Sequence, residues 1–179
     1  GRIGKLTAEP LERGFGLTLG NSIRRILLSS LQGAAITSIK IKGVIHEFST
    51  ITGVKEDLTD ILLNLKSVAV KVHSQGLKKM YLKSSGSGEL RAGNFETDSE
   101  TEIMNPDQLI MTLDSNADIE IEANVETGKG YVSAEVAEDE NKIIGEIKLD
   151  AMFSPVVKAS YKVENSRVGQ VTDFDKLVL

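Results

Sequence analysis

The sequence contains no cysteine and no tryptophan, and only 4% of its residues are aromatic. Without cysteine the chain can form neither a disulfide framework nor a thiolate metal site, so we expect a reducing, cytoplasmic location. No apolar run approaches the roughly 20 residues that cross a bilayer, which argues against a membrane-spanning helix. The scarcity of aromatic side chains also argues against a stacking platform for single-stranded nucleic acid.

Basic residues are outnumbered, because 21 Lys and Arg stand against 26 Asp and Glu, for a formal net charge of -5. A domain that binds duplex DNA usually presents a basic stripe, so we expect no direct contact with nucleic acid. The 179 residues are enough for one domain or two small ones. The missing initiator Met and the apolar end at 176–179 lead us to expect that both ends belong to a longer protein.

A first helix is predicted over residues 14–31, where apolar residues recur every three or four positions. At about 100° per residue, one sector of this helix contains Leu19, Ile23, Ile26, Leu27 and Leu31. Asn21, Arg25 and Leu28 lie opposite that sector. A Leu beside an Arg on this second face indicates contact with a partner protein, although single exposed leucines are also common on free surfaces.

A second helix is predicted over residues 52–66, with Glu56 and Asp57 in its first turn and Lys66 in its last. Residues 35–42 alternate as in a half-buried strand, with Ala35 on the same side as Ile39. Further short strands are expected over residues 68–73, 80–83, 109–113, 119–125, 131–137, 143–149 and 156–163. The predicted class is α+β, weighted towards β.

Two groups of residues suggest an alternative function. Gly14, Gly16 and Gly20 precede or open the first helix, where backbone N–H groups attract phosphate, although their spacing fits no nucleotide fingerprint. Close packing through Gly20 is the competing interpretation. Asp173 and Asp175 form a D-x-D pair that, with a third ligand, holds a divalent cation in some nucleotidyl transferases. A nucleotide- or metal-dependent enzyme is therefore the alternative hypothesis.

The remaining polar features favour simpler interpretations. His46 and His73 lack the spacing of metal ligands, so we expect both to be structural. The acidic stretches 98–102 and 138–140 are expected to be solvated surface, with a protein contact as the alternative.

Several segments resemble the α subunit of bacterial RNA polymerase. Residues 9–16 (EPLERGFG), 18–21 (TLGN) and 24–30 (RRILLSS) are similar to the signature helix of that family. The similarity covers nearly the whole chain, through GVIHEFST at 43–50, ED at 56–57, ILLNLK at 61–66, GYV at 130–132, SPV at 154–156 and TDFDKL at 172–177.

The resemblance implies an α+β fold of the RNA polymerase α/Rpb11-like kind. A discontinuous dimerisation domain, residues 1–32 plus 155–179, would be interrupted by a mostly β insert domain, residues 33–154. The implied function is that of an α subunit of DNA-directed RNA polymerase, which homodimerises and scaffolds assembly of the β and β′ catalytic subunits for transcription. Such a chain carries no catalytic residues and needs no cofactor or metal. A helix after Leu179 and a separate DNA-binding carboxy-terminal domain would be absent.

The resemblance also implies residue roles. The dimer interface would contain Phe15, Leu19, Ile23 and Ile26. Contact with the β subunit would involve Asn21, Arg25 and Leu28. The β′-side contact would involve Lys66, Leu149 and Asp150. Transcription activators would meet the acidic loop formed by Glu138, Asp139 and Glu140.

Overall fold

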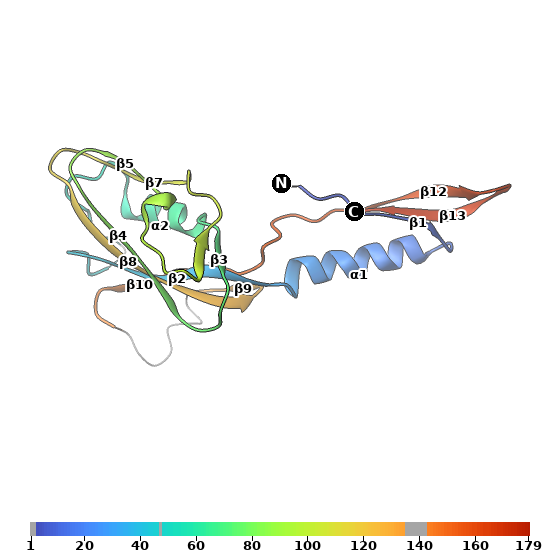
Figure 1. Cartoon of the computed structure of the whole chain (residues 1–179), viewed down its shortest axis with the longest axis horizontal. Coiled ribbons are helices and arrows are strands. Elements are labelled where there is room, and N and C mark those ends of the chain that lie inside the picture. Colours follow the sequence, from blue (N-terminus) through green and yellow to red (C-terminus); the bar gives the residue numbers. More distant parts are fainter. Residues whose placement is uncertain (1–2, 47, 135–142) are drawn as a thin grey trace. The chain divides into compact units, whose positions relative to one another are not determined.

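A computed structural model describes residues 3–46, 48–134 and 143–179 of the chain, which folds as two units (Figure 1). The terminal unit consists of Gly1–Leu31 and Ser154–Leu179, and the middle unit consists of Gln32–Phe153. Strands predominate over the two described α-helices, so the predicted α+β class is confirmed. The separate roles expected for the two units stay predictions.

The terminal unit is a helix packed on a small antiparallel sheet with the strand order β1-β13-β12. Its elements are β1 (Thr7–Leu11), α1 (Phe15–Ser29), β12 (Lys162–Val168) and β13 (Val171–Val178). β13 is the central strand, because it pairs with β1 on one side and forms a hairpin with β12 on the other. Figure 1 shows α1 running beside this hairpin.

Two glycines allow α1 to approach the hairpin closely. A Cβ atom at Gly20 would lie 2.4 Å from Cδ2 of Tyr161, and one at Gly16 would lie 2.8 Å from Cγ1 of Val163. Neither distance is compatible with a normal van der Waals contact, so a side chain at either position would push the helix away. The competing interpretation of Gly20, close packing, is therefore confirmed.

The predicted helix over residues 14–31 corresponds to α1, but the strand predicted over 156–163 is wrong. β12 begins only at Lys162, which pairs with Val178 at the end of β13. Residues before Lys162 have no strand to pair with, because β13 extends no further. Neither β1 nor β13 was predicted, because β1 is only five residues long and contains Pro10, and the charged residues of β13 hide its alternation.

The middle unit contains an antiparallel sheet of order β4-β8-β2-β3-β6, with β10 also paired to β2. Two smaller pairs, β5 with β7 and β9 with β11, complete it. The elements are β2 (Gln32–Ile41), α2 (Leu58–Lys66), β3 (Val70–Val72), β4 (Lys78–Ser85), β5 (Gly88–Arg91), the 3-10 turn Ala92–Asn94, β6 (Thr101–Ile103), β7 (Leu109–Leu113), β8 (Asp118–Lys129), β9 (Tyr131–Val132), β10 (Glu146–Lys148) and β11 (Ala151–Met152).

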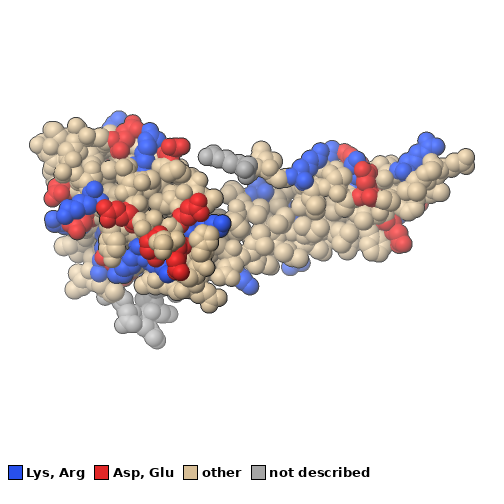
Figure 2. All heavy atoms as spheres, viewed as in Figure 1, with Lys and Arg blue, Asp and Glu red and all other residues tan. Residues whose placement is uncertain are grey.

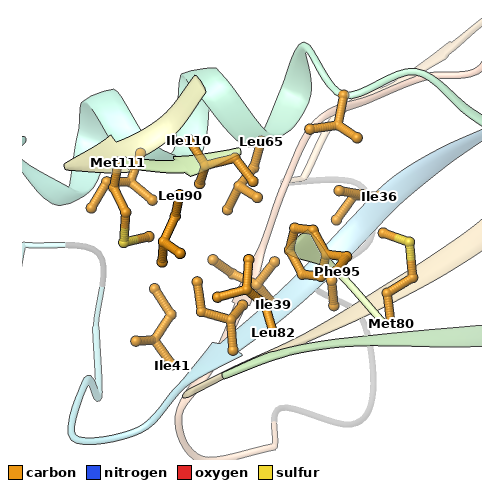
Figure 3. Packing of buried hydrophobic residues seen from close by; sticks show 14 of the residues in the cluster. Ile36, Ile39, Ile41, Leu65, Met80, Leu82, Leu90, Phe95, Ile110 and Met111 are labelled. Carbon is orange, nitrogen blue, oxygen red and sulfur yellow. The ribbon is translucent and has the colours of Figure 1, made fainter. Parts of the chain in front are cut away.

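The main hydrophobic core lies inside the middle unit (Figure 3). α2 contributes Ile61 and Leu65, and the sheet contributes Ile39 from β2 and Met80 from β4; all four side chains are fully buried. Burying each such side chain contributes about 1.5–3 kcal/mol. This core holds the end of α2 in place, and with it Lys66.

The second helix begins at Leu58 and not at Thr52 as predicted. The preceding segment is bound to β7 instead, because Glu56 accepts hydrogen bonds from the backbone N–H of Thr112 (2.7 Å) and from its hydroxyl (2.8 Å). Burial raises the pKa of Glu56, but these hydrogen bonds outweigh it and lower the pKa. Glu56 and Asp57 therefore precede the helix, while Lys66 does lie in its last turn as predicted.

Four further predictions differ from the structure. A β-bulge between Ile36 and Ser38 breaks the predicted alternation of β2, so Ala35 packs away from the main core. Thr101, expected on a solvated acidic surface, is 5% exposed because it lies in β6.

β10 is shorter than predicted because residues 143–145 form a turn with Gly145 at φ 82°. The strand expected over 131–137 is described as β9 only up to Val132.

The close approach at Gly20 yields a first prediction. Gly20→Ala should lower the stability of the chain by about 1–3 kcal/mol through overpacking, although Ala favours a helix interior over Gly by about 1 kcal/mol. Thermal melting followed by circular dichroism measures the change. Ser22→Ala, at an exposed position of the same helix, is the matched control and should melt like the wild type. A Gly20→Ala chain that is as stable as the wild type would contradict the packing described above.

Candidate subunit interface

α1 exposes a row of apolar side chains next to the face that packs on the hairpin. Phe15 is 51% exposed, Leu19 37% and Ile26 53%. These positions are spaced by four and seven residues, so they form one ridge along the helix. We call these three residues the α1 ridge. Ile23, which the sequence analysis grouped with them, is half-buried and lies nearer the packed face of Gly16 and Gly20.

The opposite side of α1 carries the residues expected to contact the β subunit. Asn21 and Arg25 are exposed, and Leu28 is half-buried. The Arg25 guanidinium makes no hydrogen bond or ion pair with any described residue, whereas the neighbouring Arg24 donates from Nε to the carbonyl oxygen of Ala159 at 3.0 Å. Arg25 is therefore available to a partner, and Arg24 belongs to the fold.

The two aspartates of the D-x-D pair have different partners within the terminal unit. One carboxylate oxygen of Asp175, Oδ2, accepts hydrogen bonds from the backbone N–H groups of Gly14 (2.9 Å) and Gly16 (3.1 Å). Asp173 forms an exposed ion pair with Arg13 at 3.4 Å. The glycine-rich helix start thus binds the chain's own carboxylate, in the place where the alternative hypothesis puts phosphate.

The predicted β′-side residues meet at the end of α2. The Lys66 ammonium donates to Asp150 Oδ2 at 2.7 Å, and Asp150 Oδ1 accepts from the backbone N–H of Ala134 at 2.9 Å. The Ala134 hydrogen bond and then Lys66 lower the pKa of Asp150. Leu149 is only 6% exposed and packs in the core, so Lys66 and Asp150 are the accessible members of this group.

Other predicted residues are not brought together. Glu138, Asp139 and Glu140 lie outside the described residues. His46 contacts Ser49, and His73 lies 3.9 Å from Glu102, both at exposed positions. Within the described residues, no three His, Cys, Asp or Glu side chains are arranged to hold a metal ion. Neither described α-helix is long and apolar enough to cross a membrane.

Basic and acidic side chains alternate on the face of the middle unit that is visible in Figure 2. Within the middle unit, Lys79 of β4 pairs with Glu122 of β8, and Lys78 of β4 pairs with Glu100 in the turn before β6. Such mixed charge differs from the basic stripe by which a protein binds a nucleic-acid backbone.

The residues that hold α1 in place could not be predicted from the sequence. Tyr161 and Asp175 bind the helix from positions more than 130 residues away in the chain, so no local pattern signals the contact. Gly16 and Gly20 did carry a signal, because two glycines four residues apart lie on one helix face and allow close approach.

The lowered pKa of Asp150 yields a second prediction. The stabilisation from this carboxylate is complete above the ordinary aspartate pKa of about 3.9 and is lost as the pH falls through the lower folded value. The wild type should therefore be more stable than Asp150→Asn at pH 7, and the difference should shrink towards pH 2. Urea unfolding at both pH values measures the two differences. A difference that stays constant or grows in acid would show that the ionised carboxylate is not the stabilising species.

Comparison with known families identifies the middle unit. Residues 39–154 match the RNA polymerase Rpb3/RpoA insert domain. The matched segment contains α2 and β3 to β11, and includes both Lys66 and Asp150. Because the match covers more than half of the chain, the protein belongs to the RNA polymerase Rpb3/RpoA insert-domain family and is a subunit of an RNA polymerase, consistent with the amino-terminal domain of an α/Rpb3 subunit.

Proposed function

We propose that the chain is an assembly subunit that homodimerises through α1 and holds the β and β′ catalytic subunits of RNA polymerase. The observation that carries this proposal is the exposed α1 ridge of Phe15, Leu19 and Ile26. Family membership supports the polymerase context, while the specific contacts are inferred from exposure and pairing on the described surface.

Self-association would be driven by burial of the α1 ridge against a second copy of the chain. Each Leu, Ile or Phe side chain that leaves water contributes about 1.5–3 kcal/mol, so three exposed ones on one helix are a substantial driving force. A second copy offers an identical ridge, and a two-fold axis brings the two ridges together in one isologous interface. The hairpin side of α1 is already packed against Tyr161 and Val163, which leaves the ridge for the partner.

The β subunit is proposed to bind the side of α1 that carries Asn21 and Arg25. An exposed guanidinium without a partner in the described chain is well suited to a carboxylate or carbonyl on another protein, because arginine presents five donors in a fixed fork. Leu28, half-buried beside it, would add apolar contact. Arginine next to apolar surface is a frequent anchor of protein interfaces.

The β′ subunit is proposed to meet the middle unit at Lys66 and Asp150. The two side chains form a 2.7 Å pair that keeps both in one geometry, and each remains about one-third exposed. Leu149 supports Asp150 from the core. A fixed and accessible ion pair gives a partner a defined pattern of charge, which favours specificity more than affinity.

No observation favours the alternative enzyme. Asp175 Oδ2 accepts from two backbone N–H groups and Asp173 pairs with Arg13, so both carboxylates already have partners within the chain. Within an RNA polymerase, the nucleotidyl transfer is proposed to belong to the other subunits.

The ridge yields a third prediction. Leu19→Ala should weaken self-association about tenfold, since truncating one buried leucine removes about 1–2 kcal/mol and 1.4 kcal/mol is a factor of ten. Sedimentation equilibrium over a concentration series measures the dissociation constant. Leu17→Ala is the matched control, because Leu17 is 62% exposed on the same helix but lies off the ridge. Equal weakening by both variants would place the interface elsewhere.

Arg25 yields a fourth prediction. Arg25→Ala should change the free energy of unfolding by no more than about 0.5 kcal/mol and leave the dimer intact. The variant should nevertheless fail to capture purified β subunit in a pull-down. Leu28→Ala should act in the same direction but more weakly. Arg24→Ala removes a hydrogen bond to Ala159 and should instead lower stability. Normal β capture by the Arg25→Ala chain would refute the proposed β surface.

A further inference from the structure

α1 begins without any local side-chain cap. Gly14 occupies the cap position in the left-handed region, at φ 90°, and has no side chain with which to accept a hydrogen bond. The first turn also contains no acidic residue. The first N–H groups of a helix have no partner within the helix, and satisfying them usually requires a nearby Ser, Thr, Asp or Asn.

The missing cap is supplied by Asp175, from the opposite end of the chain. Its Oδ2 atom accepts from the N–H of Gly14 at 2.9 Å and from the N–H of Gly16 at 3.1 Å. The negative charge also lies at the positive end of the helix dipole. Gly16 makes this approach feasible, because a Cβ at that position would lie 3.0 Å from both Cβ and Oδ2 of Asp175.

The two bound N–H groups belong to the residues on either side of Phe15. Phe15 is the first residue of the α1 ridge and is half-exposed. Fixing the backbone on both of its sides determines the direction in which its ring leaves the helix. β13, which carries Asp175, is the central strand of the unit, and Leu177, two residues further along this strand, is fully buried. The carboxylate is thus attached to the most rigid part of the sheet.

We propose that Asp175 is a positioning residue for the subunit interface: it fixes the first turn of α1 to β13 and so orients the ridge for a second copy of the chain. The part that concerns the second copy rests on the proposed function. Asp173, two residues away, has no such role, because its contact with Arg13 is an ion pair between two largely exposed side chains. Exposed ion pairs of this kind contribute little to the stability of the fold.

The test compares Asp175→Ala, Asp175→Asn and the matched control Asp173→Ala in the full chain. Amide hydrogen exchange, read residue by residue by NMR, reports the Gly16 N–H directly and does not require self-association. Asp175→Ala should accelerate this exchange about tenfold or more, as expected for loss of a helix cap. Asp175→Asn should restore slow exchange, because the amide oxygen still accepts, and Asp173→Ala should exchange like the wild type.

The dissociation constant of the dimer, from sedimentation equilibrium, tests the second part. We expect Asp175→Ala to weaken self-association about tenfold, which corresponds to the free energy that a helix cap typically contributes. The dissociation constant of Asp175→Asn should stay close to that of the wild type. Fast exchange at Gly16 with an unchanged dissociation constant would overturn the positioning role. The cap itself would be refuted if the Gly16 N–H exchanged equally fast in Asp175→Asn and Asp175→Ala. Equal exchange in Asp175→Ala and Asp173→Ala would refute it as well. A wild-type chain that never self-associates would refute the proposed dimer, while the exchange data would still decide the cap.

Discussion

The close contact between α1 and the β12–β13 hairpin is the constraint on which the rest of the terminal unit depends. Gly16 and Gly20 remove two side chains from one helix face, so the ring of Tyr161 and the Val163 side chain reach the helix backbone. The described residues leave Phe15, Leu19 and Ile26 on the neighbouring face of α1 largely uncovered. This packing leaves the α1 ridge exposed, and we propose that a second copy of the chain covers it.

The middle unit holds its exposed pair by a different means. A large apolar core fixes α2, and the Glu56 carboxylate fixes the segment that leads into it. Lys66 then lies at the end of a rigid helix, where Asp150 can meet it at 2.7 Å. If another subunit binds this pair, as proposed, fixing the two side chains beforehand reduces the conformational entropy lost on binding and so favours affinity.

Local pattern was sufficient where an element buries one regular face. α1, α2 from Leu58 onwards and the strand at 109–113 follow the period of three to four or of two, and the family resemblance agrees with the match to residues 39–154. Pattern failed where a distant contact overrides local preference. Thr112 donates a hydrogen bond to Glu56, so the second helix begins later than its pattern predicts. A bulge after Ile36 changes the face of the sheet on which the preceding residues of β2 lie.

The partners of α1 could not be predicted for the same reason. Asp175 looked like half of a metal site in the sequence, since its role depends on two backbone groups located 159 and 161 residues earlier. Spacing did place Leu19 and Ile26 of the α1 ridge in one apolar sector, whereas Phe15 was expected there only from the family resemblance. What the sequence could not show is which side of the apolar sector the hairpin covers, because that depends on the two glycines and Tyr161 acting together.

The distance between the α1 helices of two associated chains tests the central claim most directly. The chain lacks cysteine, so Ser22→Cys provides a single site for a spin label, at an exposed position between Leu19 and Ile26. Packed helices lie roughly 8–10 Å apart. We expect strong dipolar coupling between labels at Ser22 that disappears on dilution. Self-association without coupling between the Ser22 labels would contradict the proposed interface.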